Sequence, residues 1–215
     1  MSRPVWKAPG LAARLAADIA ELPAEPHWRR DYAPELSYGR HAGPVRPDAR
    51  LAAVALVLCW DDSRWSLPLT VRGAALTRHG GQVSLPGGLV DGDETARDAA
   101  ARELTEELGV RPALEWLGEL TPLFVFASNA LVTPWVAAVE GWPPWAPQAP
   151  EVDRVLRLDL EQLVEQEAVE PLTIQRGPLQ FAAPQLIVEG ESAWGATAVI
   201  LGELRGRLRR IAGAD

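Results

Sequence analysis

Three glutamates, Glu103, Glu106 and Glu107, lie close together near the end of residues 87–110, GGLVDGDETARDAAARELTEELGV, whose pattern predicts a helix. On an α-helix Glu103 and Glu107 project side by side, and Glu106 lies on an adjoining strip. Like charges at this spacing repel, and the negative end of the helix dipole adds to the cost. A hard cation such as Mg²⁺ or Mn²⁺ prefers carboxylate oxygens and would turn the repulsion into attraction. A solvated acidic helix face is the alternative interpretation.

Other residues of the same stretch can support such a metal site. The pair Gly87–Gly88 permits a tight turn with positive φ, which would let its carbonyl groups point toward the helix. The guanidinium of Arg102 can reach Glu94 or Glu106 and hold one of these carboxylates in place. These neighbours favour a metal site over a solvated acidic face.

The same residues resemble the signature of the Nudix hydrolases, G-x5-E-x7-R-E-U-x-E-E-x-G-U, in which U is an aliphatic residue. The match has no gap and falls on Gly88, Glu94, Arg102, Glu103, Leu104, Glu106, Glu107, Gly109 and Val110. The resemblance implies an α/β (α+β) fold in which a mixed β-sheet is sandwiched between helices and the signature loop and helix carry the metal. It also implies hydrolysis of a pyrophosphate that is linked to another chemical group.

The resemblance assigns a role to each residue of the signature. Glu103 and Glu107 are the principal metal ligands, Glu106 shares a second metal or helps to activate water, and the carbonyl of Gly87 or Gly88 is a further ligand. Arg102 is placed with the catalytic group because it orients the carboxylates, and the structural positions are Gly88, Glu94 and Gly109. Candidates for the general base are Glu106 and Glu151, and the family does not keep the base at one position, so both stay open.

The segment before the signature, LTVRGAALTRHGGQVSLPGG, resembles the coenzyme A pyrophosphatase branch of this family. The pattern of that branch is approximately L-T-x-R-S-x-x-L-R-x-H-x-G-Q-V-x-F-P-G-G, and the chain departs from it at Gly73, Thr77 and Leu85. The segments ALVTPWVAAV and AWGATAVIL resemble two other parts of the branch. The resemblance implies that substrate is bound by Arg72, Arg78, His79 and Gln82.

Each of these residues also has a plainer interpretation. His79 can be a loop histidine bonded to backbone, Arg72 a surface cation and Trp194 a core residue. If the arginines face the site, Arg72 or Arg78 can pair with the 3′-phosphate or the diphosphate of coenzyme A.

The predicted reaction is metal-dependent hydrolysis of coenzyme A or acyl-CoA to 3′,5′-ADP and 4′-phosphopantetheine or its acyl form. The three departures keep other nucleoside diphosphate derivatives open as substrates, namely ADP-ribose, a dinucleotide or a nucleoside triphosphate. A third alternative is a Nudix-fold binding protein without turnover, against which the intact signature argues.

Composition narrows the range of partners. The 215 residues carry a formal net charge of −8, so the chain has no general attraction to nucleic acid or anionic membranes. Its one cysteine, Cys59, lies in an apolar run, which excludes a disulfide within the chain and a Cys-rich zinc site. We expect a cytoplasmic protein with a small-molecule partner, and we retain a homodimer as an option.

The elements that must position these residues follow from periodicity and turn signals. Asp93 or Thr95 should cap the signature helix, Gly109 should end it, and Pro68 should mark an edge or a bulge in its strand. We predict a helix at 11–22, a long surface connection at 23–50, a hairpin of strands at 51–60 and 65–73, strands within 113–123 and 130–140, a loop at 141–151, a strand and short helix over 152–167, extended chain at 179–188 and a terminal helix at 193–210. The predicted units are an N-terminal helix with its connecting segment at 1–48 and a Nudix domain at 49–215.

Overall fold

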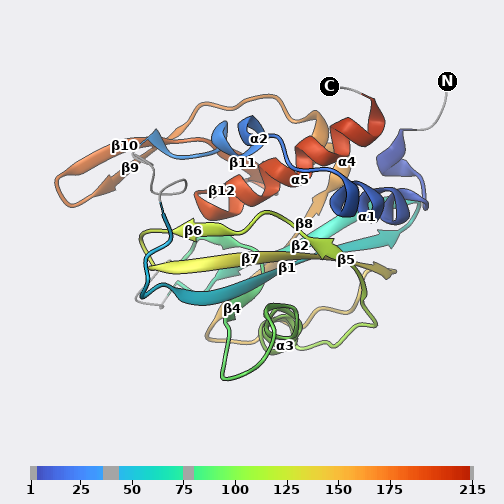
Figure 1. Cartoon of the computed structure of the whole chain (residues 1–215), viewed down its shortest axis with the longest axis horizontal. Coiled ribbons are helices and arrows are strands. Elements are labelled where there is room, and N and C mark those ends of the chain that lie inside the picture. The colour runs from blue at the N-terminus through green and yellow to red at the C-terminus, as the bar shows by residue number, and fades with distance from the viewer. Residues whose placement is uncertain (1–3, 36–43, 75–79, 214–215) are drawn as a thin grey trace.

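A mixed β-sheet with helices on both faces forms the body of the molecule, as the computed structural model shows for residues 4–35, 44–74 and 80–213 (Figure 1). Arg78, His79 and Thr77 lie outside these described residues. Within them, eight strands form the sheet, with the order β3-β2-β1-β7-β5, and β4 pairs with β1, β6 with β7 and β8 with β2. The sheet strands are β1 (Arg50–Asp61), β2 (Arg64–Arg72), β3 (Val83–Ser84), β4 (Gly87–Leu89), β5 (Glu115–Glu119), β6 (Leu123–Val125), β7 (Ala130–Glu140) and β8 (Val152–Asp159).

The helices divide between the two faces of this sheet. In Figure 1, α3 lies below the sheet, and α5 with α1 lies above it. Two small hairpins, β9–β10 and β11–β12, precede α5. The remaining elements are η1 (Val5–Lys7), α1 (Leu11–Glu21), α2 (Pro26–Arg30), α3 (Ala96–Leu108), α4 (Leu160–Glu165), β9 (Leu172–Arg176), β10 (Leu179–Ala183), β11 (Gln185–Val188), β12 (Glu191–Trp194) and α5 (Ala196–Ala212). The predicted mixed sheet between helices is confirmed, and the division of the chain at residue 48 stays a prediction.

Strand β1 runs through the middle of the sheet and is buried on both faces. It pairs in parallel with β7 from Arg50 to Trp60 and joins β2 in the predicted hairpin. Its alternate residues pack into two hydrophobic cores, one on each face of the sheet, because successive side chains of a strand point to opposite faces. Ala52, Leu56 and Leu58 belong to the core under α5, and the core under α3 receives Ala53, Ala55, Val57 and Cys59.

The thiol of Cys59 is fully buried, as the sequence predicts, and burial raises its pKa to about 12. At pH 8 its thiolate fraction should therefore be about a thousandfold lower in the folded protein than in the unfolded chain. We expect a thiol reagent to label the native protein at least about a thousandfold more slowly than the protein in denaturing urea. Labelling rates that agree within about tenfold would contradict the burial of this strand.

Pro68 lies where one side of β2 is unpaired, so the predicted edge is present locally, whereas the irregularity in the strand lies elsewhere. Strand β2 lies between β1 and β8, and its register shift falls between Val71 and Arg72. The ladder between β1 and β2 covers only residues 64–66, and Pro68 pairs with Arg157 of β8. The missing amide hydrogen is tolerated because the β1 ladder has ended before the proline.

The segment after α1 is not the plain surface connection that its composition predicts. It contains α2, whose Trp28 is buried against α5. A Cβ atom at Gly206 would overlap the Trp28 indole, and one at Gly202 would overlap the Tyr32 ring. The two glycines, four residues apart on one face of α5, therefore open the groove that holds these aromatic rings.

A buried ion network joins α1 to α5. Arg207 donates from Nη1 to Asp18 Oδ1 over 2.8 Å and from Nη2 to Glu203 Oε1 over 3.1 Å. Glu203 also accepts the Thr121 amide of the β5–β6 connection, over 3.2 Å. The apolar periodicity of 193–210 predicts this helix, but it does not reveal the charged partners on its buried side.

Candidate active site

The carboxylates of α3 lie against strand β4, where two glycines leave room for them. Glu107 is 3% exposed, and its Oε2 accepts the amide N–H of Gly87 over 3.2 Å. A Cβ atom at Gly88 would overlap the Glu103 carboxylate, and one at Gly87 would overlap the Ala53 backbone. Gly87–Gly88 is therefore an extended piece paired with β1, and the predicted tight turn is wrong.

Arg102 holds the outer carboxylates of the signature together. Its Nη2 lies 2.7 Å from Glu94 Oε1, and its Nη1 lies 2.9 Å from Glu103 Oε1 and 3.0 Å from Glu106 Oε2. Nη2 also donates to the Leu89 carbonyl over 2.9 Å. The hydrogen bond from Arg102 is the main reason that the pKa of Glu94 is lowered. Arg102 thus reaches both carboxylates that the sequence offered as its alternative partners.

The helix that carries these carboxylates begins and ends as its sequence predicts. Of the two candidate caps, Thr95 is the one used, and its hydroxyl accepts the Asp98 amide over 3.2 Å. Gly109 ends the helix in the left-handed region with a φ of 66°. The apolar side of α3 packs against β1, and this packing leaves Glu103 and Glu107 facing β4.

The surroundings of the two inner carboxylates, Glu103 and Glu107, disfavour their charged forms. The pKa of Glu107 is raised to about 7, mainly by burial and also by the charges of Glu103 and Glu151, against the lowering effects of Arg72 and the Gly87 amide. Burial also raises the pKa of Glu103, with further increases from Glu106 and Glu151. Glu151, in the loop before β8, therefore adds negative charge to this group.

The donor chemistry of this group fits a hard divalent cation. Within residues 4–35, 44–74 and 80–213, no three Asp, Glu, His or Cys side chains already form a closed metal cluster. Glu103 and Glu107 are desolvated carboxylates whose mutual repulsion is only partly offset by Arg72 and Arg102. A bound cation would offset the rest, because hard cations take oxygen ligands of this kind.

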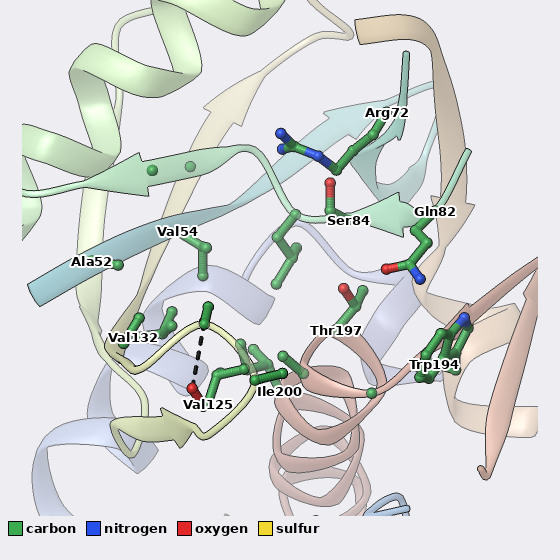
Figure 2. A pocket seen from close by; sticks show the side chains of 18 of the residues that line it. Ala52, Val54, Arg72, Gln82, Ser84, Val125, Val132, Trp194, Thr197 and Ile200 are labelled. Atoms are coloured by element: carbon green, nitrogen blue, oxygen red, sulfur yellow. Dashed lines mark hydrogen bonds between the residues drawn. The ribbon is translucent and has the colours of Figure 1, made fainter. Parts of the chain in front are cut away.

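A cavity of about 530 Å³ lies beside β4, on the face of the sheet that α5 covers. Gly87 and Gly88 belong both to its lining and to the contact with the α3 carboxylates. Figure 2 shows Arg72 and Ser84 at one side of the cavity and Val125 and Ile200 at the opposite side. The lining includes Val54, Arg72, Gln82, Ser84, Leu85, Val125, Phe126, Val132, Phe181, Trp194, Thr197 and Ile200.

Arg72 connects the cavity to the carboxylates. Its Nη1 lies 3.6 Å from Glu107 Oε1, and its side chain is 28% exposed. Its Nε is buried and has no hydrogen-bond partner among the described residues. A buried donor of this kind is normally satisfied, so Arg72 can still accommodate an acceptor group.

The cavity contains one predicted substrate residue besides Arg72, and it contains residues that sequence reasoning missed. Gln82 lines it as expected, whereas Trp194, which the sequence placed in the core, is half-buried in its wall (Figure 2). Phe126 and Phe181 were not anticipated, because Phe126 lies in the turn after β6 and Phe181 in the short strand β10, and neither segment has apolar periodicity. The position of Trp194 just before a helix that packs on the sheet was the one available clue.

One departure from the coenzyme A branch has a structural reason. A Cβ atom at Gly73 would overlap the Pro150 carbonyl, and the Gly73 amide donates to the Glu151 carbonyl over 2.9 Å. Glycine in place of the serine of that branch lets the loop that carries Glu151 close onto the end of β2.

Several known proteins are similar to this chain. The protein-family model described as NUDIX domain matches residues 49–176. Proteins called uncharacterized Nudix hydrolase NudL from Salmonella paratyphi B and Salmonella newport are each 36% identical over 140 residues, which is 64% of this chain and 72% of theirs. Among solved structures, a MutT/nudix family protein from Enterococcus faecalis aligns over 94% of this chain and 79% of its own, with 15% identity and a TM-score of 0.48.

A second solved structure, the Nudix hydrolase RenU from M. smegmatis, aligns over 53% of this chain and 72% of its own, with 23% identity and a TM-score of 0.45. No helix in the described part of the chain is long and apolar enough to cross a membrane. The family match and the intact glutamate signature lead to the same conclusion: this chain belongs to the Nudix family and is a pyrophosphohydrolase of nucleoside diphosphate derivatives.

Proposed function

We propose that this Nudix enzyme hydrolyses the pyrophosphate of coenzyme A or an acyl-CoA, giving 3′,5′-ADP and 4′-phosphopantetheine or its acyl form. The position of Arg72 is the observation that carries the proposal. It contacts Glu107 of the carboxylate group, lines the cavity and retains a buried donor. A diphosphate at this point would have a cation beside it and space for a long substituent on one side.

The carboxylates of α3 would hold the metal that Nudix hydrolases generally require. Glu103 and Glu107 would be the main ligands of Mg²⁺ or Mn²⁺, with Glu106 and the Gly87 carbonyl as further donors. A bound metal supplies charge neutralisation and a lowered pKa for water at such a site. Arg102 keeps Glu103 and Glu106 in place through its bonds of 2.9 and 3.0 Å.

The reaction then needs a proton acceptor and an oriented diphosphate. Water attacks a phosphorus atom, the bridging P–O bond breaks, and the proton of the water passes to Glu106 or Glu151. Arg72 orients the diphosphate through charge-assisted hydrogen bonds. The acidic net charge of −8 makes this local cation important, because the overall field opposes an anionic substrate.

Substrate preference tests the proposal directly. We expect kcat/KM for coenzyme A to exceed that for dephospho-CoA by about ten- to a hundredfold, because a charge-assisted contact to the 3′-phosphate is worth roughly 1.5–3 kcal/mol. The measurement is product mass from a panel of coenzyme A, dephospho-CoA, ADP-ribose, NADH and nucleoside triphosphates, each with Mg²⁺ and with Mn²⁺. Cleavage of ADP-ribose without cleavage of coenzyme A would refute the proposal and leave another Nudix substrate.

Arg72→Ala is the test variant in the same panel, and Arg50→Ala is its matched control. Arg72 contacts Glu107, so its loss should lower kcat/KM for coenzyme A and dephospho-CoA alike. Arg50, at the start of β1, also lines the cavity, but its Nη2 donates to the Ser128 carbonyl over 2.9 Å. Its loss should have a smaller effect on cleavage of dephospho-CoA than the loss of Arg72.

A further inference from the structure

We infer that the chain after residue 176 builds one wall of the cavity and that this wall selects the substrate by its uncharged arm, the pantetheine and acyl end. The inference rests on the proposed function. The family match ends at residue 176, before the elements β10 and β12 and the helix α5. These elements nevertheless supply Phe181, Trp194, Gly195, Ala196, Thr197 and Ile200 to the cavity.

The rest of the lining is apolar as well. It comes from β6, the β6–β7 connection and the central strands, with Val125, Phe126, Val132 and Val54 in the lining. Phe126 is 47% exposed although it is aromatic. A large apolar side chain exposed at the edge of a concave site is the kind of surface that a ligand covers.

The hydroxyl groups of Ser84 and Thr197 in this lining already make hydrogen bonds within the protein. Ser84 Oγ lies 2.8 Å from Thr70 Oγ1, and Thr197 Oγ1 donates to the Val83 carbonyl over 3.2 Å. A purine base needs donors and acceptors along its edge to be recognised. A methylene-rich arm needs apolar surface instead, and this lining offers it.

Arg50 of the lining donates to the Ser128 carbonyl, and the other two long polar side chains, Arg72 and Gln82, match the order of groups along such a substrate. Arg72 lies near the carboxylates, and Figure 2 shows Gln82 between Arg72 and Trp194. A carboxamide both donates and accepts, so Gln82 suits the amide groups of pantetheine. Val125 and Ile200, at the side opposite Arg72, would then receive the acyl end.

A series of acyl-CoA substrates of increasing chain length tests the inference. With coenzyme A, acetyl-CoA, butyryl-CoA and hexanoyl-CoA, kcat/KM should rise about two- to fourfold per buried methylene until the cavity is filled. Phe126→Ala should reduce this slope by at least about half. Ala196→Leu, which adds volume to the wall, should shift the optimum to a shorter chain.

Leu22→Ala is the matched control, because Leu22 is 46% exposed and does not line the cavity. It should leave the acyl dependence unchanged. Thermal unfolding of each variant confirms that the fold is retained. A flat acyl series together with good cleavage of coenzyme A would overturn the inference and leave the proposed function intact. Failure to cleave coenzyme A at all would refute both the inference and the proposed function.

Product inhibition provides a second readout. Phe126→Ala should weaken inhibition by 4′-phosphopantetheine about fivefold or more and leave inhibition by 3′,5′-ADP within about twofold. The reverse pattern would place the nucleoside in this cavity and overturn the inference, again without affecting the reaction itself.

Discussion

Replacing Glu107 by glutamine should lower turnover by about a hundredfold or more and leave the protein folded. Glutamine keeps the shape of the side chain and one oxygen, but it removes the charge that would hold the metal. Loss of several kcal/mol of transition-state stabilisation corresponds to a decrease of this size. The fold should persist, because the replaced carboxylate is already desolvated and opposed by Glu103 and Glu151.

The measurement is kcat at saturating Mg²⁺ and at saturating Mn²⁺, with thermal unfolding of the same samples. Glu119→Gln, an exposed substitution at the end of β5, is the control and should retain full activity. A variant with Gln at 107 that turns over within about threefold of the unmodified enzyme would show that Glu107 is not required.

Replacing Arg207 by methionine should lower the free energy of unfolding by about 3–5 kcal/mol. Breaking a buried ion pair leaves an uncompensated charge in the protein interior, and this cost exceeds the value of the pair itself. Here the buried acids Asp18 and Glu203 lose the same partner. Asp18 keeps Arg210 over 2.7 Å, so the cost falls mainly on Glu203, whose other cation, Arg29, lies 3.9 Å away. Urea unfolding monitored by tryptophan fluorescence measures the change.

Arg64→Met is the surface counterpart of this substitution. Arg64 pairs with Asp159 over 3.3 Å, but both side chains are substantially exposed, so its loss should cost less than about 1 kcal/mol. If the two variants unfold within about 1 kcal/mol of each other, then the network between α1 and α5 does not stabilise the protein as its burial indicates.

The parts that the sequence predicts well are those in which a local pattern determines the outcome. The apolar run of β1, the Thr95 cap and the Gly109 stop each act over a few residues, and each appears as expected. The cavity was harder to predict from the sequence, because its walls come from segments more than a hundred residues apart. Trp28 shows the difference, since its burial depends on Gly206 of α5, which no local periodicity reveals.

The sequence predicts a tight turn at Gly87–Gly88 whose carbonyl groups point toward the helix, whereas the structure has a strand whose Gly87 amide N–H donates to Glu107. Two adjacent glycines before a helix are compatible with a tight turn or with a close approach of backbone to another group. The structure adopts the second arrangement, because β4 pairs with β1 and the α3 carboxylates fill the space next to the two glycines. Only the packing of three separate elements distinguishes the two arrangements.

The glycine groove of α5 also affects how the molecule opens in solution. The five-residue helix α2 is too short to persist by itself, and its order depends on seating Trp28 over Gly206. Any fluctuation that releases α2 therefore uncovers an indole and the backbone of α5 at the same moment. The amides of α2 should therefore exchange with solvent through this one event, whereas the amides of α5 should stay protected by the hydrogen bonds of that helix and by its packing on the sheet.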